Sequence, residues 1–359
     1  MDSIKIVTCL SLLSSGLIAA ADRESFLTSE QKAYLQQPPN TYKGQAITPE
    51  TILGLLTQVV PGDSVQEAAV QRYIQEKGIA DILSGEQYQK TFFCGAPEER
   101  QALKKEHDDR MRAAGIQNLS RNNYVFEVPD TDLVVKKTCV PTTRQNLVAT
   151  SERNKWEGRP AWQYGRTVSP EEYERWKTEV GGRTYQNTSR AMTYLRAKEA
   201  AEIFGTSELV SIPETQLVHI PGRPTEVDDT NYVVVEKKFG ERSDWNSSHV
   251  AIDEPSALAV TKLTAATGWW EMKDAGSVVD GKLCYHDQEL PNDHDITKVY
   301  HRDKNHFRAL AHIGWNQLEN QIIKPYADAH KDNPEVQQQI AALLAKKHAL
   351  QEEIKACWE

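Results

Sequence analysis

The stretch YVFEVPDTDLVVK, residues 124–136, begins the part of the chain that decides the fold. Two runs rich in Val, Tyr, Phe and Leu, at 124–128 and 133–136, flank a Pro-Asp-Thr-Asp turn, and this pattern predicts a β-hairpin. Because side chains alternate along a strand, Val134 and Lys136 share one face of its second strand. The sequence therefore predicts a lysine side chain at the end of an apolar strand.

The next regular element is a helix over residues 189–204, which Gly205 ends. Its apolar stripe is formed by Met192, Leu195 and Ile203. Glu199 lies in the middle of this stripe, where a carboxylate is costly unless it is paired. We therefore expect Glu199 to pair with Lys136 of the preceding strand.

Shorter signals place the remaining elements. Strands are predicted at 216–220 and 232–235, a helix at 255–267 that stops at Gly268, a hairpin at 278–286 around Asp280-Gly281, and helices at 304–326 and 333–356. Residues 22–115 are predicted to be helical. One helix begins at Thr48-Pro49, a second spans 64–77 and a third spans 98–114.

This order of elements resembles the protein-kinase fold over about residues 116–290. In kinases a lysine at the end of a V-A-I-K strand pairs with a glutamate of the next helix, and Lys136 and Glu199 match those positions in order and context. The run VDGKLCYHDQE, residues 279–289, resembles the hairpin that ends in the metal-binding aspartate of D-F-G. Asp287 matches that aspartate, and Gln288-Glu289 replace Phe-Gly.

The resemblance implies an α+β protein with a two-lobed, kinase-like domain. A small, mostly antiparallel sheet and a reduced helical C-lobe would follow an N-terminal helical segment. The expected boundaries are a signal peptide at 1–21, the helical segment at 22–115, an N-lobe at 116–240 and a C-lobe at 241–359. A Trp-rich insertion at 141–185 interrupts the N-lobe.

The same resemblance implies ATP and Mg²⁺ as cofactors. Lys136 would hold the phosphates, Glu199 would orient Lys136, and Asp287 would hold the metal ion. The catalytic loop departs from the family, because alignment on the hairpin puts Met272 at the catalytic aspartate and Ser277 at the metal-binding asparagine. This places Glu271 and Asp274, which flank Met272, as the candidate bases.

Other departures and alternatives accompany these assignments. No glycine lies between Gly115 and Lys136, so the Gly-rich loop over the phosphates is missing. The tripeptide His301-Arg302-Asp303 spells the kinase catalytic loop, but it follows the Asp287 hairpin, and Asp303 is better interpreted as a helix N-cap. Lys136 as a solvated strand end and Asp287 as a turn residue are the structural alternatives.

The beginning of the chain predicts export. Lys5, an apolar run from Ile6 to Ala21 and three terminal alanines have the pattern of a signal peptide, the alternative being a buried helix. We expect a secreted or exported, periplasmic or extracellular protein with no stable membrane anchor. Four cysteines, Cys94, Cys139, Cys284 and Cys357, would then remain, and three disulfide pairings or four buried thiols stay open.

The net charge of the chain and the motifs it lacks limit which functions are plausible. The chain has 42 Lys and Arg against 51 Asp and Glu, a net charge of −9, and no basic run, which disfavours nucleic acid as a partner. The sequence predicts a secreted kinase-like protein with ATP-dependent phosphotransferase activity and a degraded catalytic loop. The alternative is a pseudokinase-like, inactive binding protein with a protein partner. A hydrolase of another fold is disfavoured, because neither Gly-x-Ser-x-Gly nor His-Glu-x-x-His occurs. Substrate and oligomeric state stay open.

Overall fold

A computed structural model of the chain combines helices with small sheets, so the expected α+β class is confirmed. The structure describes residues 25–37, 41–46, 64–120, 124–137, 169–171, 186–225, 230–238, 243–244, 252–269, 276–279, 282–285 and 304–359. Several expectations fall outside these residues. Among them are the segment at 1–21, the helix at Thr48, most of the insertion at 141–185, the Asp280-Gly281 turn and the N-cap at Asp303.

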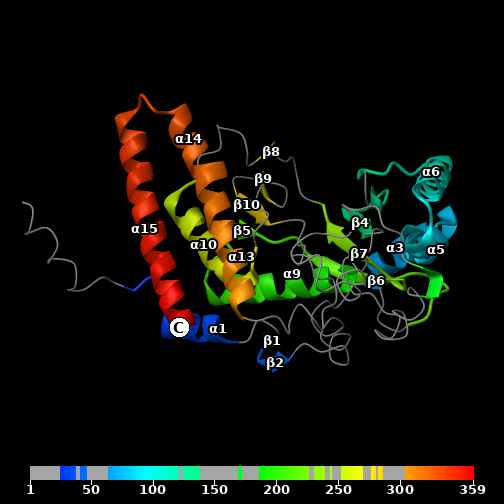
Figure 1. Cartoon of the computed structure of the whole chain (residues 1–359), viewed down its shortest axis with the longest axis horizontal. Helices are drawn as coiled ribbons and strands as arrows, with labels where there is room; N and C mark the ends of the chain where they lie inside the picture. The colour runs from blue at the N-terminus through cyan, green and yellow to red at the C-terminus, as the bar shows by residue number, and fades with distance from the viewer. Residues whose placement is uncertain are drawn as a thin grey trace, which may run out of the picture.

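The larger sheet has four antiparallel strands in the order β3-β4-β7-β6 (Figure 1). They are β3 (Tyr124–Glu127), β4 (Leu133–Lys137), β6 (Thr215–His219) and β7 (Tyr232–Lys237). Each predicted strand of this region is therefore confirmed within two residues. The chain passes from β4 to β6 through α9 (Gln186–Ile203), and α9 packs against β6 and β7.

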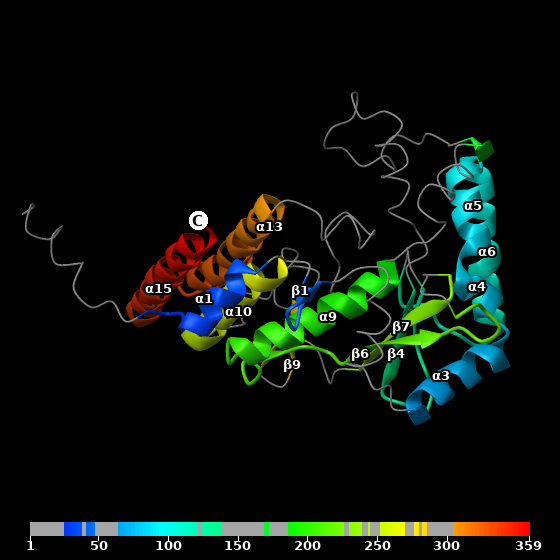
Figure 2. The same cartoon turned by 90° about the horizontal axis from the view of Figure 1, so that it is seen from below.

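Four helices cover one face of this sheet (Figure 2). They are α3 (Ser64–Lys77), α4 (Ala80–Ser84), α5 (Glu86–Cys94) and α6 (Pro97–Ala113). The alternate residues Phe126, Val135 and Val233 of the sheet are buried against Ile74 and Met111 of these helices. Because strand side chains alternate, Val134 and Lys136 lie on the opposite face of the sheet, where Val234 of β7 is also buried.

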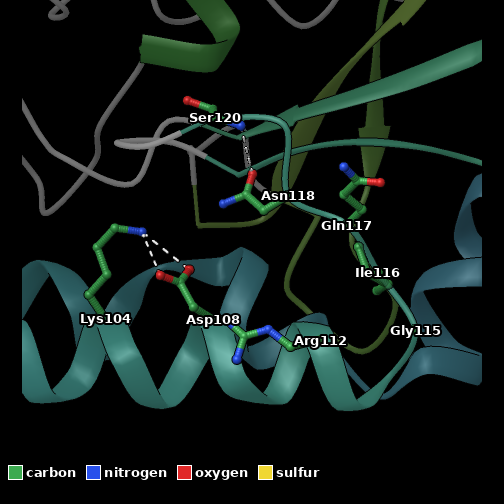
Figure 3. Close-up of a pocket in the computed structure, with 8 residues that line it drawn as sticks. All are labelled: Lys104, Asp108, Arg112, Gly115, Ile116, Gln117, Asn118 and Ser120. Atoms are coloured by element: carbon green, nitrogen blue, oxygen red, sulfur yellow. Dashed lines mark hydrogen bonds and ion pairs between the residues drawn. The ribbon is translucent and has the colours of Figure 1, made fainter.

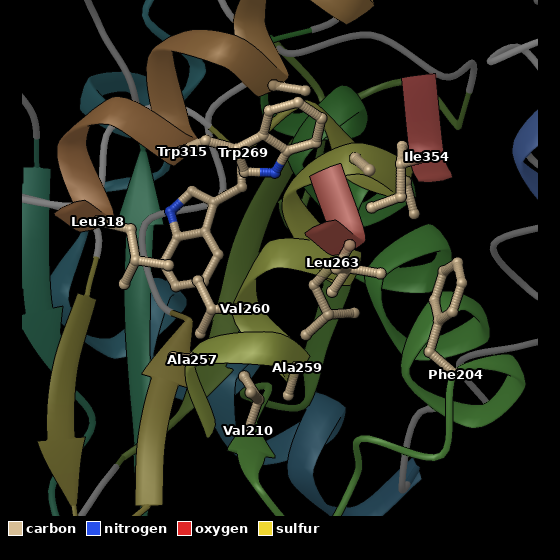
Figure 4. Close-up of a cluster of buried hydrophobic side chains, with 14 of the residues drawn as sticks. Phe204, Val210, Ala257, Ala259, Val260, Leu263, Trp269, Trp315, Leu318 and Ile354 are labelled. Carbon is tan, nitrogen blue, oxygen red and sulfur yellow. The ribbon is translucent and has the colours of Figure 1, made fainter. Parts of the chain in front are cut away.

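A second core joins the C-terminal helices to a smaller sheet (Figure 4). The sheet has the order β5-β10-β9-β8, and its strands are β5 (Val210–Ser211), β8 (Ser243–Asp244), β9 (Gly276–Val279) and β10 (Lys282–Tyr285). The helices are α10 (Glu254–Thr267), α13 (Lys304–Gln317), a π-helical stretch η2 (Leu318–Ile323), α14 (Lys324–Ala329) and α15 (Pro334–Trp358). Trp315 of α13 is buried in this core, and its indole N–H donates to the Thr261 carbonyl at 3.0 Å.

The N-terminal segment 25–46 also belongs to this second core. It contains α1 (Ser29–Gln36) and a two-stranded hairpin of β1 (Thr41–Tyr42) and β2 (Gln45–Ala46), none of which the sequence predicted individually. Glu353 of α15 accepts hydrogen bonds from the Ser25 hydroxyl and, at 2.8 Å, from the Phe26 N–H. Leu27, Tyr34 and Leu35 are buried, so the segment is packed rather than loosely attached.

Helix ends follow the glycine signals in the sequence. Gly78, Gly115, Gly205 and Gly268 all have positive φ, between 61° and 77°, a conformation that glycine adopts without steric cost. The helices predicted at 64–77, 98–114, 189–204 and 255–267 are confirmed within three residues of their ends. The two predicted C-terminal helices are also present, although η2 interrupts the regular hydrogen bonding of the first.

Among the described cysteines, Cys94, Cys284 and Cys357 make no disulfide with one another. Cys139 lies outside the described residues. Separately, none of the described helices is long and apolar enough to cross a membrane.

Gly314 permits a close approach of α13 to Thr264 of α10 and to the Trp269 backbone. A Cβ atom at this position would lie 2.6 Å from Cγ2 of Thr264 and even nearer to the Trp269 carbonyl oxygen. Real side chains do not make such contacts, so only glycine lets α13 pack here. The backbone of Trp269 is therefore fixed by α13.

We expect Gly314→Ala to lower the free energy of unfolding by about 1–3 kcal/mol, because an added methyl group overpacks this contact. Helix propensity alone predicts the opposite sign, a gain of about 1 kcal/mol. Ile313→Ala is the control, since that side chain is 44% exposed and its loss should change stability by less than about 0.5 kcal/mol. Chemical denaturation measures both, and a more stable Gly314→Ala variant would contradict the packing argument.

Candidate functional site

Lys136 lies on a central strand of the larger sheet. In β4 it is paired with Val125 of β3 on one side and Val234 of β7 on the other. Its ammonium forms an ion pair with Glu236 of β7, with 2.7 Å between Nζ and Oε2. The side chains are only 12% and 7% exposed, so Lys136 is not the solvated strand end of the structural alternative.

Glu199 has other partners, and the predicted pair with Lys136 is wrong. One carboxylate oxygen of Glu199 accepts from the Tyr34 hydroxyl at 3.2 Å, and the other accepts from the Lys43 backbone N–H at 2.8 Å. Among the residues that the structure describes, no ion pair joins Glu199 to Lys136. Glu199 therefore faces α1 and β1 instead of the strand that carries Lys136.

The tyrosines around Glu199 stay protonated. Burial, opposed by Arg196 and reinforced by Glu199, raises the pKa of Tyr34 to about 12. Burial, together with Glu199 and Glu202, also raises the pKa of Tyr42 to about 12. The neutral hydroxyl of Tyr34 is thus a lasting donor to Glu199, and it attaches the N-terminal segment to α9.

Arg196 connects α9 to the end of α10. Its guanidinium is buried and donates to the Ala266 carbonyl at 3.2 Å. A cation here satisfies a carbonyl in the last turn of α10 and complements the helix dipole. The position of α9 is therefore coupled to the point at which the chain leaves α10.

Trp269 and Tyr285 fix the chain next to the predicted acidic residues. Their rings stack with centroids 3.9 Å apart, and Tyr285 is paired with Gly276 in the hairpin β9–β10. Trp269 and Gly276, the described residues on either side of 270–275, therefore both lie beside Tyr285. Trp269 is buried and belongs to the second core.

Glu271, Asp274 and Asp287 themselves lie outside the described residues. Glu271 and Asp274 belong to the segment 270–275, and Asp287 follows Tyr285 by two residues. Within the described part of the chain, no cluster of three or more His, Cys, Asp or Glu is arranged to hold a metal ion.

A polar cavity of about 580 Å³ lies at the end of α6 (Figure 3). Lys104 and Asp108, which line it, form an ion pair at 3.2 Å, and Arg112 pairs with Asp109. Asn118 Oδ1 accepts backbone N–H groups of Ser120 and Val125 and so supports the turn before β3. The charges on this wall are mutually neutralised, and neither Lys136 nor Glu199 is among the described residues that line the cavity.

An ion cluster in the second core was not predicted from the sequence. Glu319 of η2 accepts from Lys347 at 2.9 Å and from His348 at 2.8 Å, and it pairs with Lys324 at 3.0 Å. The Lys347 side chain is only 1% exposed. Burial alone would raise the pKa of Glu319, but hydrogen bonds from His348, Lys347 and Lys324 lower it to about 2. A glutamate followed by two distant lysines gives no local pattern that could reveal this cluster.

Comparison with known proteins identifies no relative: no family model, no curated protein and no solved structure matches the chain. The function has therefore to be inferred from the residues of this chain and their arrangement.

We expect Glu319→Gln to destabilise the protein by about 3 kcal/mol, because the buried Lys347 ammonium would lose its carboxylate partner. The double variant Glu319→Gln, Lys347→Met removes both charges and should recover most of that loss. A double-mutant cycle from denaturant unfolding checks this. If the single variant Glu319→Gln and the double variant are equally unstable, the unpaired ammonium of Lys347 is not the cause of the loss of stability.

The same substitution should change the response to acid. The pKa of Glu319 is lower in the folded chain than its ordinary value of 4.5, so its stabilising effect is present above about pH 4.5 and is lost as pH falls toward 2. Unfolding curves from pH 5 to pH 2.5 should therefore be less pH-dependent in Glu319→Gln than in the native chain.

Proposed function

We propose that the chain is an exported, kinase-like protein that binds ATP with Mg²⁺ and transfers the γ-phosphoryl group to a hydroxyl. The order of elements supports the proposal. The strand that carries Lys136 is followed by α9, then by two further strands of the same sheet, then by α10 and the hairpin β9–β10. This is the order that the kinase resemblance requires up to the metal-binding aspartate.

The single observation that carries the proposal is the state of Lys136. Its ammonium is held at low exposure on the face of the sheet away from α3–α6, already in contact with a carboxylate. A lysine ammonium has three N–H donors, and one ion pair leaves donors for phosphate oxygens. The chemistry of this side chain therefore fits the phosphates of a nucleotide.

The acidic residues of the proposed site are assigned by their positions in the sequence next to described residues. Asp287 is proposed to hold Mg²⁺, and Asp274 or Glu271 to act as the base toward the hydroxyl. In support, the Trp269–Tyr285 stack and the Gly276–Tyr285 pair hold Trp269 and Gly276, which flank 270–275 in the sequence, beside β10, which precedes Asp287 in the sequence. Phosphoryl transfer depends mainly on positioning and electrostatics, which such anchors provide.

A second candidate function is binding without transfer, with a protein as the partner. It is favoured by Ser277, which occupies the position of the metal-binding asparagine and lies in β9 opposite Cys284. A serine hydroxyl is a poorer oxygen ligand than an asparagine carbonyl for a hard cation. An active enzyme must bind ATP, and an inactive binding protein can still bind it. ATP binding is therefore the property to test first.

We expect Mg²⁺ and ATP together to raise the thermal midpoint of the purified chain, because a ligand that binds the folded state stabilises it by mass action. Lys136→Ala and Asp287→Ala should abolish the rise. Lys237→Ala is the matched control, since this lysine is on the neighbouring strand and 51% exposed.

A transfer assay with γ-labelled ATP and a mixed protein acceptor then separates the two candidates. Label transfer that is lost in Asp274→Asn or Glu271→Gln supports the enzyme. Binding without transfer supports the second candidate. No midpoint shift at millimolar ATP in a folded sample would refute every nucleotide-dependent function.

A further inference from the structure

Among the described residues, Glu236 is the carboxylate that pairs with Lys136, and the sequence did not single it out. It lies in β7, is 5% exposed, and ends the apolar run of that strand. We infer that Glu236, and not a residue of α9, is the positioning residue that holds Lys136 for a phosphate ligand. This inference rests on the proposed function and deepens it.

The register of the sheet brings the two side chains together. Lys136 is paired with Val234 and Glu236 with Val134, so Lys136 and Glu236 are diagonal neighbours on one face. Long side chains reach across such a diagonal, and here Nζ and Oε2 are 2.7 Å apart. The ladder of hydrogen bonds between β4 and β7 therefore fixes the geometry of the pair.

Glu199 cannot serve the same role in this arrangement. Both of its carboxylate oxygens are engaged by the N-terminal segment, through the Tyr34 hydroxyl and the Lys43 N–H. In kinases the nucleotide-binding lysine needs a carboxylate partner, which a helix supplies. In this chain a strand supplies it. The orientation of Lys136 should consequently be independent of any movement of α9.

Energetics also favour a positioning role for Glu236. An ammonium at 12% exposure is costly unless it is paired, so Lys136 without Glu236 would turn toward solvent. With Glu236 in place the side chain stays against the sheet, and its remaining donors have a fixed direction. The carboxylate thus acts through Lys136 and need not touch the nucleotide.

The pairing is tested first without nucleotide, by ¹H–¹⁵N correlation spectra of lysine side-chain ammonium groups in the full chain. Ammonium groups held in buried ion pairs exchange slowly with water and give signals. The Lys136 signal, assigned by its absence in Lys136→Arg, should disappear in Glu236→Gln and persist in Glu199→Gln. The Lys347 signal is an internal reference, because that side chain is 1% exposed and paired with Glu319. Loss of the Lys136 signal in Glu199→Gln alone would overturn the inference.

Titration with Mg²⁺ and ATP then tests the role. Glu236→Gln should weaken binding about tenfold, the loss expected for one charge-assisted contact, and Glu236→Asp should recover most of it. Glu199→Gln should stay within about twofold of the native chain. Glu127→Gln is the matched control, an exposed glutamate of the same sheet paired with Lys238.

The outcomes separate the two claims. If the native chain binds no ATP, the proposed function fails, and so does the nucleotide role of Glu236, whatever the spectra show. If the native chain binds ATP and Glu236→Gln binds it equally well or more tightly, the proposed function stands and the positioning role is refuted. Where Glu236→Gln does not fold, Glu236→Asp carries the test, because a shortened carboxylate should give an intermediate affinity and a weakened Lys136 signal.

Discussion

The structure depends on helix α9, which has to satisfy two surfaces at once. It packs against β6 and β7, and its residues Ala197, Ala200 and Ala201 are buried in the core of the C-terminal helices. The small alanine side chains allow α10 to pack close to α9. Two independent packings fix the rotation of α9 about its axis, and this rotation turns Glu199 toward the N-terminal segment instead of toward Lys136.

The N-terminal segment reinforces the same constraint from outside. Through Glu353 it is attached to α15, and through Glu199 it is attached to α9. Lys32 adds an ion pair to Glu353 at 3.0 Å. A carboxylate that accepts hydrogen bonds from backbone N–H groups is held more strongly than one in an exposed ion pair. The contacts of Glu353 and Glu199 therefore stabilise the position of the N-terminal segment. The segment 25–46 thus links two helices that are more than 130 residues apart in sequence.

Local signals in the sequence predicted most elements, because they depend on local physics. Helices end where a glycine accepts positive φ, and strands alternate because their side chains do. The Lys136–Glu199 pair failed because it required a rotation of α9 that only tertiary packing decides. Glu236 was overlooked because an acidic residue after an apolar run is typical of a strand leaving the core, whereas here Lys136 makes its burial favourable. The Glu319 cluster was overlooked because its partners come from two helices.

The proposed site has two halves, and they are built on different cores. Lys136 lies on the sheet that packs against α3–α6, whereas Trp269 and Tyr285 belong to the core of the C-terminal helices. Glu236 makes the first half rigid within one sheet, and Gly314 makes the second rigid by letting α13 contact Trp269. What sets the separation between the halves is α9, which packs on the sheet and, through Arg196, holds the end of α10. Although Glu199 does not contact Lys136, α9 therefore has a structural role, which is to set the distance between the two halves of the proposed site.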